Sequence, residues 1–230
     1  MALEVLVVED DAVLRELLSL HLGAQGYRVR SSSSGEAALE ECSRLRPDVV
    51  VLDVSLPGKS GIEICAALRA VKPTPGVVIV TARASEADVM LGFDSGADDY
   101  VIKPCRPREI VARVAALARR LKPEAGNHEV LRSGDLVIDV AAMRASVGPR
   151  VLELTPTELA VLVILVREKG AVHSRKSLLS TVWSSSHEGY ARNVDCHVAR
   201  LRRKLEAAAF AGQKSIETVH GTGYRWNENL

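Results

Sequence analysis

The chain has 230 residues, enough for two domains, and its 30 Lys and Arg nearly balance its 29 Asp and Glu. Hydrophobic residues make up 47% of it and aromatic residues only 3%, so its cores must be aliphatic. The chain has no apolar run of about 18 residues, no basic leader and no paired-cysteine motif, which argues against a membrane span, a secretory signal, a disulfide framework and a thiolate metal cluster, and favours a cytoplasmic protein.

The first half of the chain alternates apolar runs with helical patterns. We expect five strands, at Val5–Val8, Tyr27–Val29, Val49–Leu52, Val77–Val80 and Tyr100–Ile102. Helical segments between strands are typical of parallel sheets with crossover helices. Serines stand where helix N-caps are needed, at Ser34, Ser60 and Ser85. The pattern therefore predicts a doubly wound parallel α/β domain.

Polar residues follow four of these strands. The carboxyl ends of parallel strands share one edge of the sheet, where open α/β sheets place their chemistry. We therefore expect several side chains to converge in one crevice: Glu9, Asp10 and Asp11 after the first strand, Asp53 after the third, Thr81 after the fourth and Lys103 after the fifth.

This residue set suits phosphoryl transfer. Clustered carboxylates repel one another, and a hard divalent cation such as Mg²⁺ relieves the repulsion. Asp53 can then remain ionised and attack phosphorus, which gives an aspartyl phosphate. The Lys103 ammonium and the Thr81 hydroxyl would hold the phosphoryl oxygens.

Four motifs, VVEDD, LDVSLPG, VTAR and GADDYVIKP, resemble the receiver domain of two-component response regulators, over nearly all of residues 3–121. The family's fold is a flavodoxin-like, five-stranded doubly wound sheet. The resemblance implies that Asp53 is the phosphoacceptor for a sensor histidine kinase. It implies Mg²⁺ bound by Glu9, Asp10, Asp53 and the backbone carbonyl of Ser55. The phosphoryl-binding and switch positions would be Thr81, the backbone of Ala82, Lys103 and Tyr100.

The same resemblance implies a homodimer through the receiver domain, with charged residues on the dimer face at Asp98, Asp99, Glu109, Arg113 and Arg119. Three residues depart from the family pattern. Ser55 stands where Met is frequent, Val89 where a basic residue is frequent, and Cys105 where Phe is usual. The basic residue would pair with an acid across the dimer, and an exposed pair contributes about 0–1 kcal/mol, so its loss should weaken the dimer modestly.

The departures leave an alternative open, a DNA-binding regulator that no longer depends on phosphorylation. A second alternative is a phosphatase with an aspartate nucleophile. Such an enzyme would need a second acid two residues after Asp53 as its general acid, and Ser55 occupies that position. We therefore expect a protein that is not an enzyme.

The stretch 122–128 is polar, contains Pro and Gly, and predicts a linker between domains 1–121 and 129–230. Residues 1–121 carry 15 basic against 17 acidic residues, and the remainder carries 15 against 12. After the linker we expect strands at Leu136–Ile138, Arg144–Val147 and Val151–Leu154. Thr155, Pro156 and Glu158 then form a helix start, before a core helix over Leu159–Glu168 and a shorter one over Ser174–Trp183.

The segment Tyr190–Leu205 predicts an amphipathic helix with an Arg-rich face. Val194, Val198, Leu201 and Leu205 form its apolar stripe. By charge alone such a face is more often simply solvated. A short helix before it and a hairpin over Ser215–Trp226 instead indicate a helix–turn–helix with a wing.

The motifs LTPTE, RNVDCHVARLRRKLE and IETVHGTGYRW resemble the winged helix–turn–helix of the OmpR/PhoB subfamily, over roughly residues 129–227. The resemblance implies binding to double-stranded DNA, with the third helix in the major groove and the wing in the minor groove. It also implies that the second helix and its Ser184–Ala191 loop contact RNA polymerase. His220 stands where the wing often has Arg, so we expect wing affinity to depend on pH. Arg200 is our first candidate for base contact and Asn193 the second. The expected DNA-binding residues are Arg192, Asn193, His197, Arg200, Arg202, Arg203, Lys204, Thr218, His220 and Thr222.

Overall fold

The computed structural model describes residues 2–71, 73–121, 129–183, 191–210 and 212–227. The chain divides into two compact units, Met1–Ala118 and Arg119–Leu230, a division that falls within the last helix of the first half. The predicted linker 122–128 and most of the predicted polymerase-contacting loop, 184–190, lie outside the described residues. Within the described part of the chain, no helix has the length and apolar character to cross a membrane.

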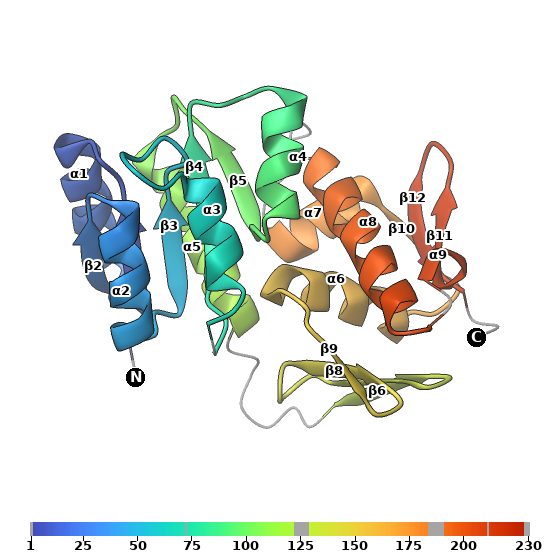
Figure 1. Cartoon of the computed structure of the whole chain (residues 1–230). Helices are drawn as coiled ribbons and strands as arrows, with labels where there is room; N and C mark the ends of the chain where they lie inside the picture. Colours follow the sequence, from blue (N-terminus) through green and yellow to red (C-terminus); the bar gives the residue numbers. More distant parts are fainter. Residues whose placement is uncertain (1, 72, 122–128, 184–190, 211, 228–230) are drawn as a thin grey trace. The chain divides into compact units, whose positions relative to one another are not determined.

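The first unit is built on a five-stranded parallel sheet (Figure 1). Its strands are β1 (Glu4–Val8), β2 (Arg28–Ser32), β3 (Val49–Leu52), β4 (Gly76–Thr81) and β5 (Asp99–Ile102). Their spatial order is β2-β1-β3-β4-β5, and every neighbouring pair is parallel. The chain moves outward from β1 to β2 and then crosses to β3 on the other side. This reversal opens a crevice at the carboxyl ends of β1 and β3. The predicted doubly wound fold is confirmed.

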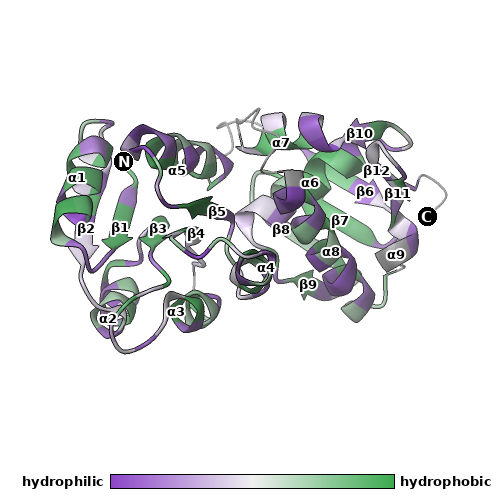
Figure 2. Ribbon diagram, turned by 90° about the horizontal axis from the view of Figure 1, so that it is seen from above, coloured by the Kyte–Doolittle hydropathy of each residue, from purple (hydrophilic) through white to green (hydrophobic). Residues whose placement is uncertain are grey.

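Helices cover both faces of this sheet (Figure 2). On one face lie α1 (Ala12–Gly23) and α5 (Pro107–Leu121), and on the other lie α2 (Gly35–Leu45), α3 (Gly61–Leu68) and α4 (Glu86–Asp94). The three predicted serine caps each accept a backbone N–H from the first turn of their helix. Because both faces are covered, every residue of β3 and β4 is buried, which explains their unbroken apolar runs.

Gly61 sets how closely α3 approaches the carboxyl end of β3. A Cβ atom at this position would lie 2.0 Å from the carbonyl oxygen of Asp53. No side chain fits there, so glycine is required for this close backbone approach. The Gly61 N–H donates to the Val54 carbonyl at 3.0 Å, which folds the loop after Asp53 back onto the strand.

The second unit begins with a four-stranded antiparallel sheet of β6 (Val130–Ser133), β7 (Leu136–Asp139), β8 (Arg144–Val147) and β9 (Arg150–Leu152). The helices are α6 (Pro156–Arg167), α7 (Arg175–Trp183), α8 (Ala191–Ala207) and the short α9 (Gly212–Ser215). The hairpin of β11 (Ile216–Val219) and β12 (Gly223–Trp226) follows, and β10 (Val172–Ser174) pairs with β12. The unit is a winged helix–turn–helix, as predicted.

One apolar core joins these elements. α6 begins with the predicted capping box of Thr155 and Glu158 and is buried on most of its surface. Val194, Val198, Leu201 and Leu205, the predicted stripe of α8, are all fully buried in the same cluster. Trp226 at the end of the hairpin is also buried, and its indole N–H donates to the Ser133 hydroxyl at 3.0 Å.

Three elements of the second unit were not predicted from the sequence: β6, β10 and α9. β10 has only three residues, two of them polar, so no periodic pattern is visible. Gly223 makes its pairing possible, because a Cβ there would lie 2.0 Å from the His173 carbonyl oxygen. The short strand is thus defined by a tertiary contact with the hairpin.

Candidate functional site

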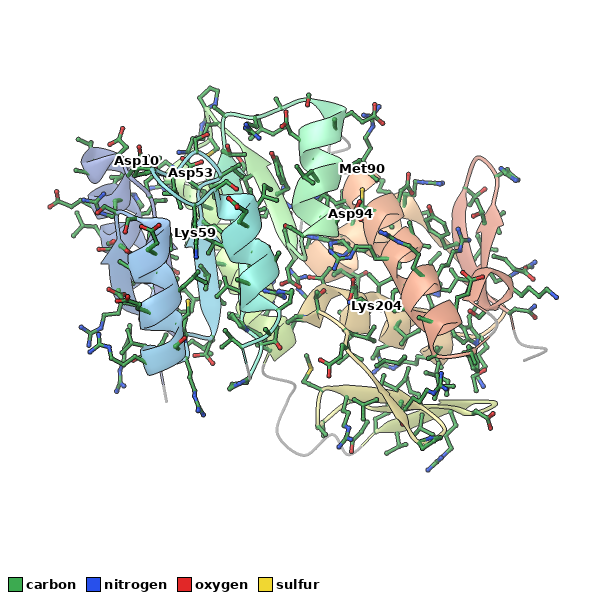
Figure 3. All side chains as sticks on the ribbon, viewed as in Figure 1. Asp10, Asp53, Lys59, Met90, Asp94 and Lys204 are labelled. Carbon is green, nitrogen blue, oxygen red and sulfur yellow. The ribbon has the colours of Figure 1, made fainter. Side chains whose placement is uncertain are left out.

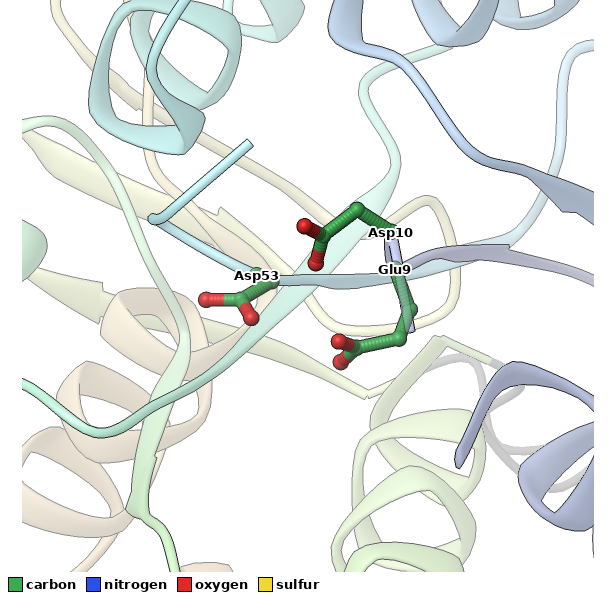
Figure 4. Close-up of side chains that lie close together, drawn as sticks. All are labelled: Glu9, Asp10 and Asp53. Carbon is green, nitrogen blue, oxygen red and sulfur yellow. The ribbon is translucent and has the colours of Figure 1, made fainter. Parts of the chain in front are cut away.

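Three carboxylates meet at the carboxyl edge of the parallel sheet (Figure 4), and two of them, Asp10 and Asp53, are also labelled in Figure 3. Glu9 and Asp10 follow β1, and Asp53 follows β3. One oxygen of each lies within 4.8 Å of the others. Glu9 and Asp53 are buried, whereas Asp10 is exposed, so the cluster is open to solvent on the Asp10 side. The predicted convergence of these three acids is confirmed.

Lys103, which follows β5, supplies the positive charge of the cluster. Its ammonium donates to Asp53 Oδ2 at 2.6 Å and to Glu9 Oε2 at 2.8 Å. The other oxygen of Asp53, Oδ1, accepts the Ser55 N–H at 2.9 Å. Both oxygens of Asp53 are therefore fixed in position by donors from two different segments.

The cluster changes the proton affinities of its members. Burial raises the pKa of Glu9, the nearby Asp53 adds to the rise, and the hydrogen bond from Lys103 opposes it. Burial of the Lys103 ammonium acts to lower its pKa, but the hydrogen bonds to Asp53 and Glu9 outweigh it and the pKa is raised. Lys103 is therefore fully charged at neutral pH.

Asp11, the third acid of the run, has a different role. Its carboxylate caps α1 by accepting the N–H groups of Val13 at 2.8 Å and Leu14 at 3.0 Å. These hydrogen bonds also lower its pKa. Asp11 thus belongs to the helix start and not to the cluster.

Thr81 and Tyr100 reach the same loop. Thr81 is fully buried at the end of β4, and its hydroxyl accepts the Arg83 N–H at 3.4 Å. Tyr100 is buried on β5 and its hydroxyl donates to the Arg83 carbonyl at 3.0 Å. Ala82, between Thr81 and Arg83, is exposed. The β4–α4 loop therefore connects the acidic cluster to the aromatic side chain.

The donor set fits a hard divalent cation. Such ions prefer carboxylate oxygens, and Mg²⁺ in particular takes one or two carboxylates plus water. Three carboxylates within 4.8 Å of one another supply those ligands. The pKa of Glu9 is raised mainly by burial and further by the charge of Asp53, and a cation would offset both effects. Lys103 neutralises only part of the acidic charge.

Most of the predicted dimer-face charges are bonded within the first unit. Asp98 is fully buried and accepts the Val77 N–H at 2.9 Å. Asp99 forms an ion pair with Arg113 at 3.2 Å, and Glu109 lies 3.8 Å from the same guanidinium. Only Arg119 is exposed. Asp99 of β5 is thus paired with Arg113 of α5, whereas Asp98 is held by β4, and the role of these charges in a dimer face stays a prediction.

The predicted DNA-binding residues of α8 fall into three groups. Arg192 and Arg203 are exposed and Arg202 and Lys204 are half-buried, whereas Asn193, His197 and Arg200 are buried. The ring of His197 lies 5.3 Å from the ring of Trp183 on α7. The sequence-based helical wheel placed only one stripe of α8 in contact with the domain, whereas α6 and α7 also cover its flank.

Arg200, our first candidate for base contact, is paired within the second unit instead. Its Nε lies 2.9 Å from Glu158 Oε1 at the start of α6. Lys204, labelled in Figure 3, donates to Glu158 Oε2 at 2.5 Å and to the Glu153 carbonyl at 2.6 Å. The Arg200 guanidinium is therefore held against Glu158 in the free protein, and base contact by Arg200 stays a prediction.

The hairpin is tied to α8 by a network that sequence reasoning missed. Asp195 Oδ1 accepts Arg175 Nε at 2.7 Å and the Tyr224 hydroxyl at 2.6 Å. Burial, together with Asp195, raises the pKa of Tyr224 to about 12. Arg202 donates from Nε to the Ile216 carbonyl at 3.0 Å and from Nη2 to Thr218 Oγ1 at 2.9 Å. The sequence signal was Asp195, the one acid between Arg192 and Leu205 in a basic stretch.

Three predicted contact residues lie on the hairpin. Thr218, His220 and Thr222 are all exposed. An open hollow is lined by Arg202, Glu217, Thr218 and His220. The exposed arginines of α8, Arg192 and Arg203, and these three hairpin residues are therefore accessible to solvent. The fold and the two sites define a receiver-type α/β domain with an acidic cluster, joined to a winged helix–turn–helix domain.

Comparisons with known proteins support this class. Residues 5–115 match the family described as response regulator receiver domain, and residues 149–226 match the family described as transcriptional regulatory protein, C terminal. The chain is 43% identical to the transcriptional regulatory protein AfsQ1 of Streptomyces coelicolor over 96% of each chain. It is 42% identical to the DNA-binding response regulator MtrA of Mycobacterium tuberculosis, over 96% of this chain and 95% of MtrA.

Solved structures agree. The OmpR/PhoB homologue DrrB of Thermotoga maritima matches 99% of this chain and 100% of its own, with a TM-score of 0.53 and 32% identity. A mutant of RitR matches the same shares with a TM-score of 0.72 and 27% identity. The chain belongs to the OmpR/PhoB family of two-component transcriptional response regulators.

Proposed function

We propose that Asp53 accepts a phosphoryl group from the phosphohistidine of a sensor histidine kinase, and that this reaction controls DNA binding. One observation carries the proposal: the Lys103 ammonium donates hydrogen bonds to the carboxylates of Asp53, at 2.6 Å, and Glu9, at 2.8 Å. The buried Thr81, which carries a hydroxyl, ends the neighbouring strand β4. This arrangement provides a nucleophile and a cation at one point.

We propose that Mg²⁺ is held by Glu9, Asp10, Asp53 and the backbone carbonyl of Ser55. When bound, the ion offsets the negative charge shared by the carboxylates and the incoming phosphoryl oxygens. Two observations support this: carboxylate oxygens of Glu9, Asp10 and Asp53 lie within 4.8 Å of one another, and the pKa of Glu9 is raised.

The protein groups have distinct tasks in the transfer. A carboxylate oxygen of Asp53 forms the new P–O bond while the P–N bond to the kinase histidine breaks, and the imidazole keeps the electron pair of that bond. The Lys103 ammonium passes from the carboxylate pair to a phosphoryl oxygen. The Thr81 hydroxyl and the Ala82 N–H bind further phosphoryl oxygens.

The output is transcriptional regulation by a DNA-bound dimer in the cytoplasm. The dimer face comprises α4, β5 and α5, where Met90 (labelled in Figure 3), Leu91 and Ile102 are exposed. Double-stranded DNA is bound by the exposed or half-buried members of the predicted set, and RNA polymerase is contacted through the loop of which 184–190 lie outside the described residues. The DNA set is Arg192, Arg202, Arg203, Lys204, Thr218, His220 and Thr222.

The proposal is tested by measuring DNA affinity and oligomeric state of the full chain with and without acetyl phosphate and Mg²⁺. We expect phosphoryl uptake, dimerisation and tighter DNA binding to occur together. Acetyl phosphate without Mg²⁺ is the control and should leave the protein monomeric. Equal DNA binding in all conditions would overturn the phosphorylation control and leave a constitutive DNA-binding protein.

A second prediction concerns Arg203, which is exposed on α8. As a phosphate contact it releases bound counterions, so Arg203→Ala should reduce the slope of log affinity against log salt by about 0.9. Nonspecific duplex DNA is sufficient as the probe, because phosphate contacts do not depend on base sequence. Glu206→Ala, an exposed change on the same helix, is the control. An unchanged slope for Arg203→Ala would remove this residue from the interface.

A further inference from the structure

Tyr100 occupies a closed site between β5 and α4. Its side chain is 2% exposed, its ring lies 6.1 Å from the ring of Phe93, and its hydroxyl bonds the Arg83 carbonyl at 3.0 Å. The Arg83 carbonyl is in the loop that leads into α4. The hydrogen bond from the Tyr100 hydroxyl to this carbonyl therefore forms only while the ring lies against α4.

Gly92 of α4 supplies the space for that ring. A Cβ atom at Gly92 would lie 2.6 Å from Cε2 and 2.7 Å from Cδ2 of Tyr100, and 3.3 Å from Cδ1 of Ile79. Distances under 3.0 Å do not occur for real Cβ atoms, and a flat ring packed against Phe93 has no flexible end that could move aside. The ring would have to leave its site.

The backbone gives no other reason for glycine here. Gly92 lies within α4 and is not among the residues with positive φ. Glycine inside a helix is unfavourable compared with alanine, so this position carries a cost in helix propensity. The close contact with the Tyr100 ring accounts for it.

Arg83 connects this packing to the phosphorylation site. Its N–H donates to the Thr81 hydroxyl at 3.4 Å and its carbonyl accepts from Tyr100 at 3.0 Å. Its guanidinium pairs with Asp88 in the first turn of α4 at 3.4 Å. Movement of the Tyr100 ring thus removes the donor that holds the loop between Thr81 and α4.

We propose that Gly92 is a positioning residue of the phosphorylation switch: it alone admits the inward Tyr100, and through Arg83 it couples the state of Thr81 to the α4–β5 face. This inference rests on the proposed function, since it takes Thr81 as the residue that responds to the phosphoryl group. A side chain at position 92 expels the Tyr100 ring from its site. Phosphorylation of the receiver then no longer produces its full gain in DNA affinity.

The test compares wild type with Gly92→Ala in the full chain. Exposure of Tyr100 is measured by nitration with tetranitromethane and peptide mass spectrometry. We expect Tyr100 to be protected in wild type and modified in the variant. Phosphoryl uptake from acetyl phosphate should persist, while the gain in DNA affinity on phosphorylation should fall by about 5-fold to 100-fold.

Two controls separate this effect from a general one. Gly23→Ala is a matched change at the end of α1, where nothing lies within 4 Å of an added Cβ, and it should change neither readout. In a Tyr100→Ala background the clash is absent, so Gly92→Ala should then have no effect of its own on DNA affinity.

The outcomes are distinguishable. A protected Tyr100 and full coupling in Gly92→Ala would overturn the inference, as would an equal effect of Gly23→Ala. If Gly92→Ala does not fold, recovery of folding in Gly92→Ala/Tyr100→Ala supports the ring contact, and failure of both overturns it. If wild type shows no response to acetyl phosphate, the proposed function fails, and the nitration result still decides the packing part.

Discussion

Replacement of Asp53 by Asn should abolish phosphoryl uptake and, with it, the increase in DNA affinity caused by acetyl phosphate and Mg²⁺. The loss should be complete, because the amide has no carboxylate oxygen to form the P–O bond. Asn keeps an oxygen that can accept the Ser55 N–H, which Asp53 Oδ1 accepts at 2.9 Å, so the loop should keep its conformation. The measurements are intact mass after treatment with acetyl phosphate and DNA affinity in the same samples.

Asp11→Asn is the matched control for this change. Asp11 is a neighbouring acid that caps α1 and is not part of the carboxylate cluster, and Asn is an equally good N-cap. This variant should take up the phosphoryl group as wild type does. Uptake by Asp53→Asn at the wild-type level would show that another residue is the acceptor, and peptide mapping would identify it.

Replacement of Glu158 by Ala should destabilise the DNA-binding domain by about 3–5 kcal/mol, the usual cost of leaving a buried charge without its partner. Glu158 is fully buried, and its carboxylate lies 2.9 Å from Arg200 and 2.5 Å from Lys204. The change also removes the reciprocal capping bond to the Thr155 N–H at the start of α6. Such a loss is a large part of the stability of a typical domain.

Urea unfolding followed by tryptophan fluorescence measures this effect. The chain contains two tryptophans, Trp183 and Trp226, both in the second unit, so the signal reports on the DNA-binding domain alone. Glu158→Gln keeps the capping bond and removes only the charge, so this variant should lose less unfolding free energy than Glu158→Ala. Glu206→Ala, exposed on α8, should be nearly neutral. If Glu158→Ala is also neutral, the ion pairs do not stabilise the domain.

The acidic cluster could be predicted because sheet geometry alone brings it together. Glu9, Asp53 and Lys103 each follow an apolar run, and in a parallel sheet all such ends lie on one edge. The role of Asp11 could not be separated from that of Glu9, since both are acids after the same strand. The backbone decided it, because only Asp11 stands where its carboxylate reaches the first N–H groups of α1.

The faces of α8 show the limit of one-dimensional patterns. A wheel places the apolar stripe correctly, but it treats every other residue as solvent-facing. Arg200 is instead paired with Glu158, which lies 42 positions earlier in the chain and is buried at the start of a different helix. Asp98 in the first unit is also buried by a contact that a local pattern does not reveal, since it accepts the N–H of Val77, 21 positions away.

Local periodicity and the rule for parallel strand ends were sufficient to predict the alternating elements of the first unit, most elements of the second, the serine caps and the edge at which the acids meet. Which charges a partner can reach became visible only in the folded chain. Burial and pairing depend on which elements pack against a residue: Glu158 removes Arg200 from the surface, Asp99 holds Arg113, and Gly92 makes room for Tyr100.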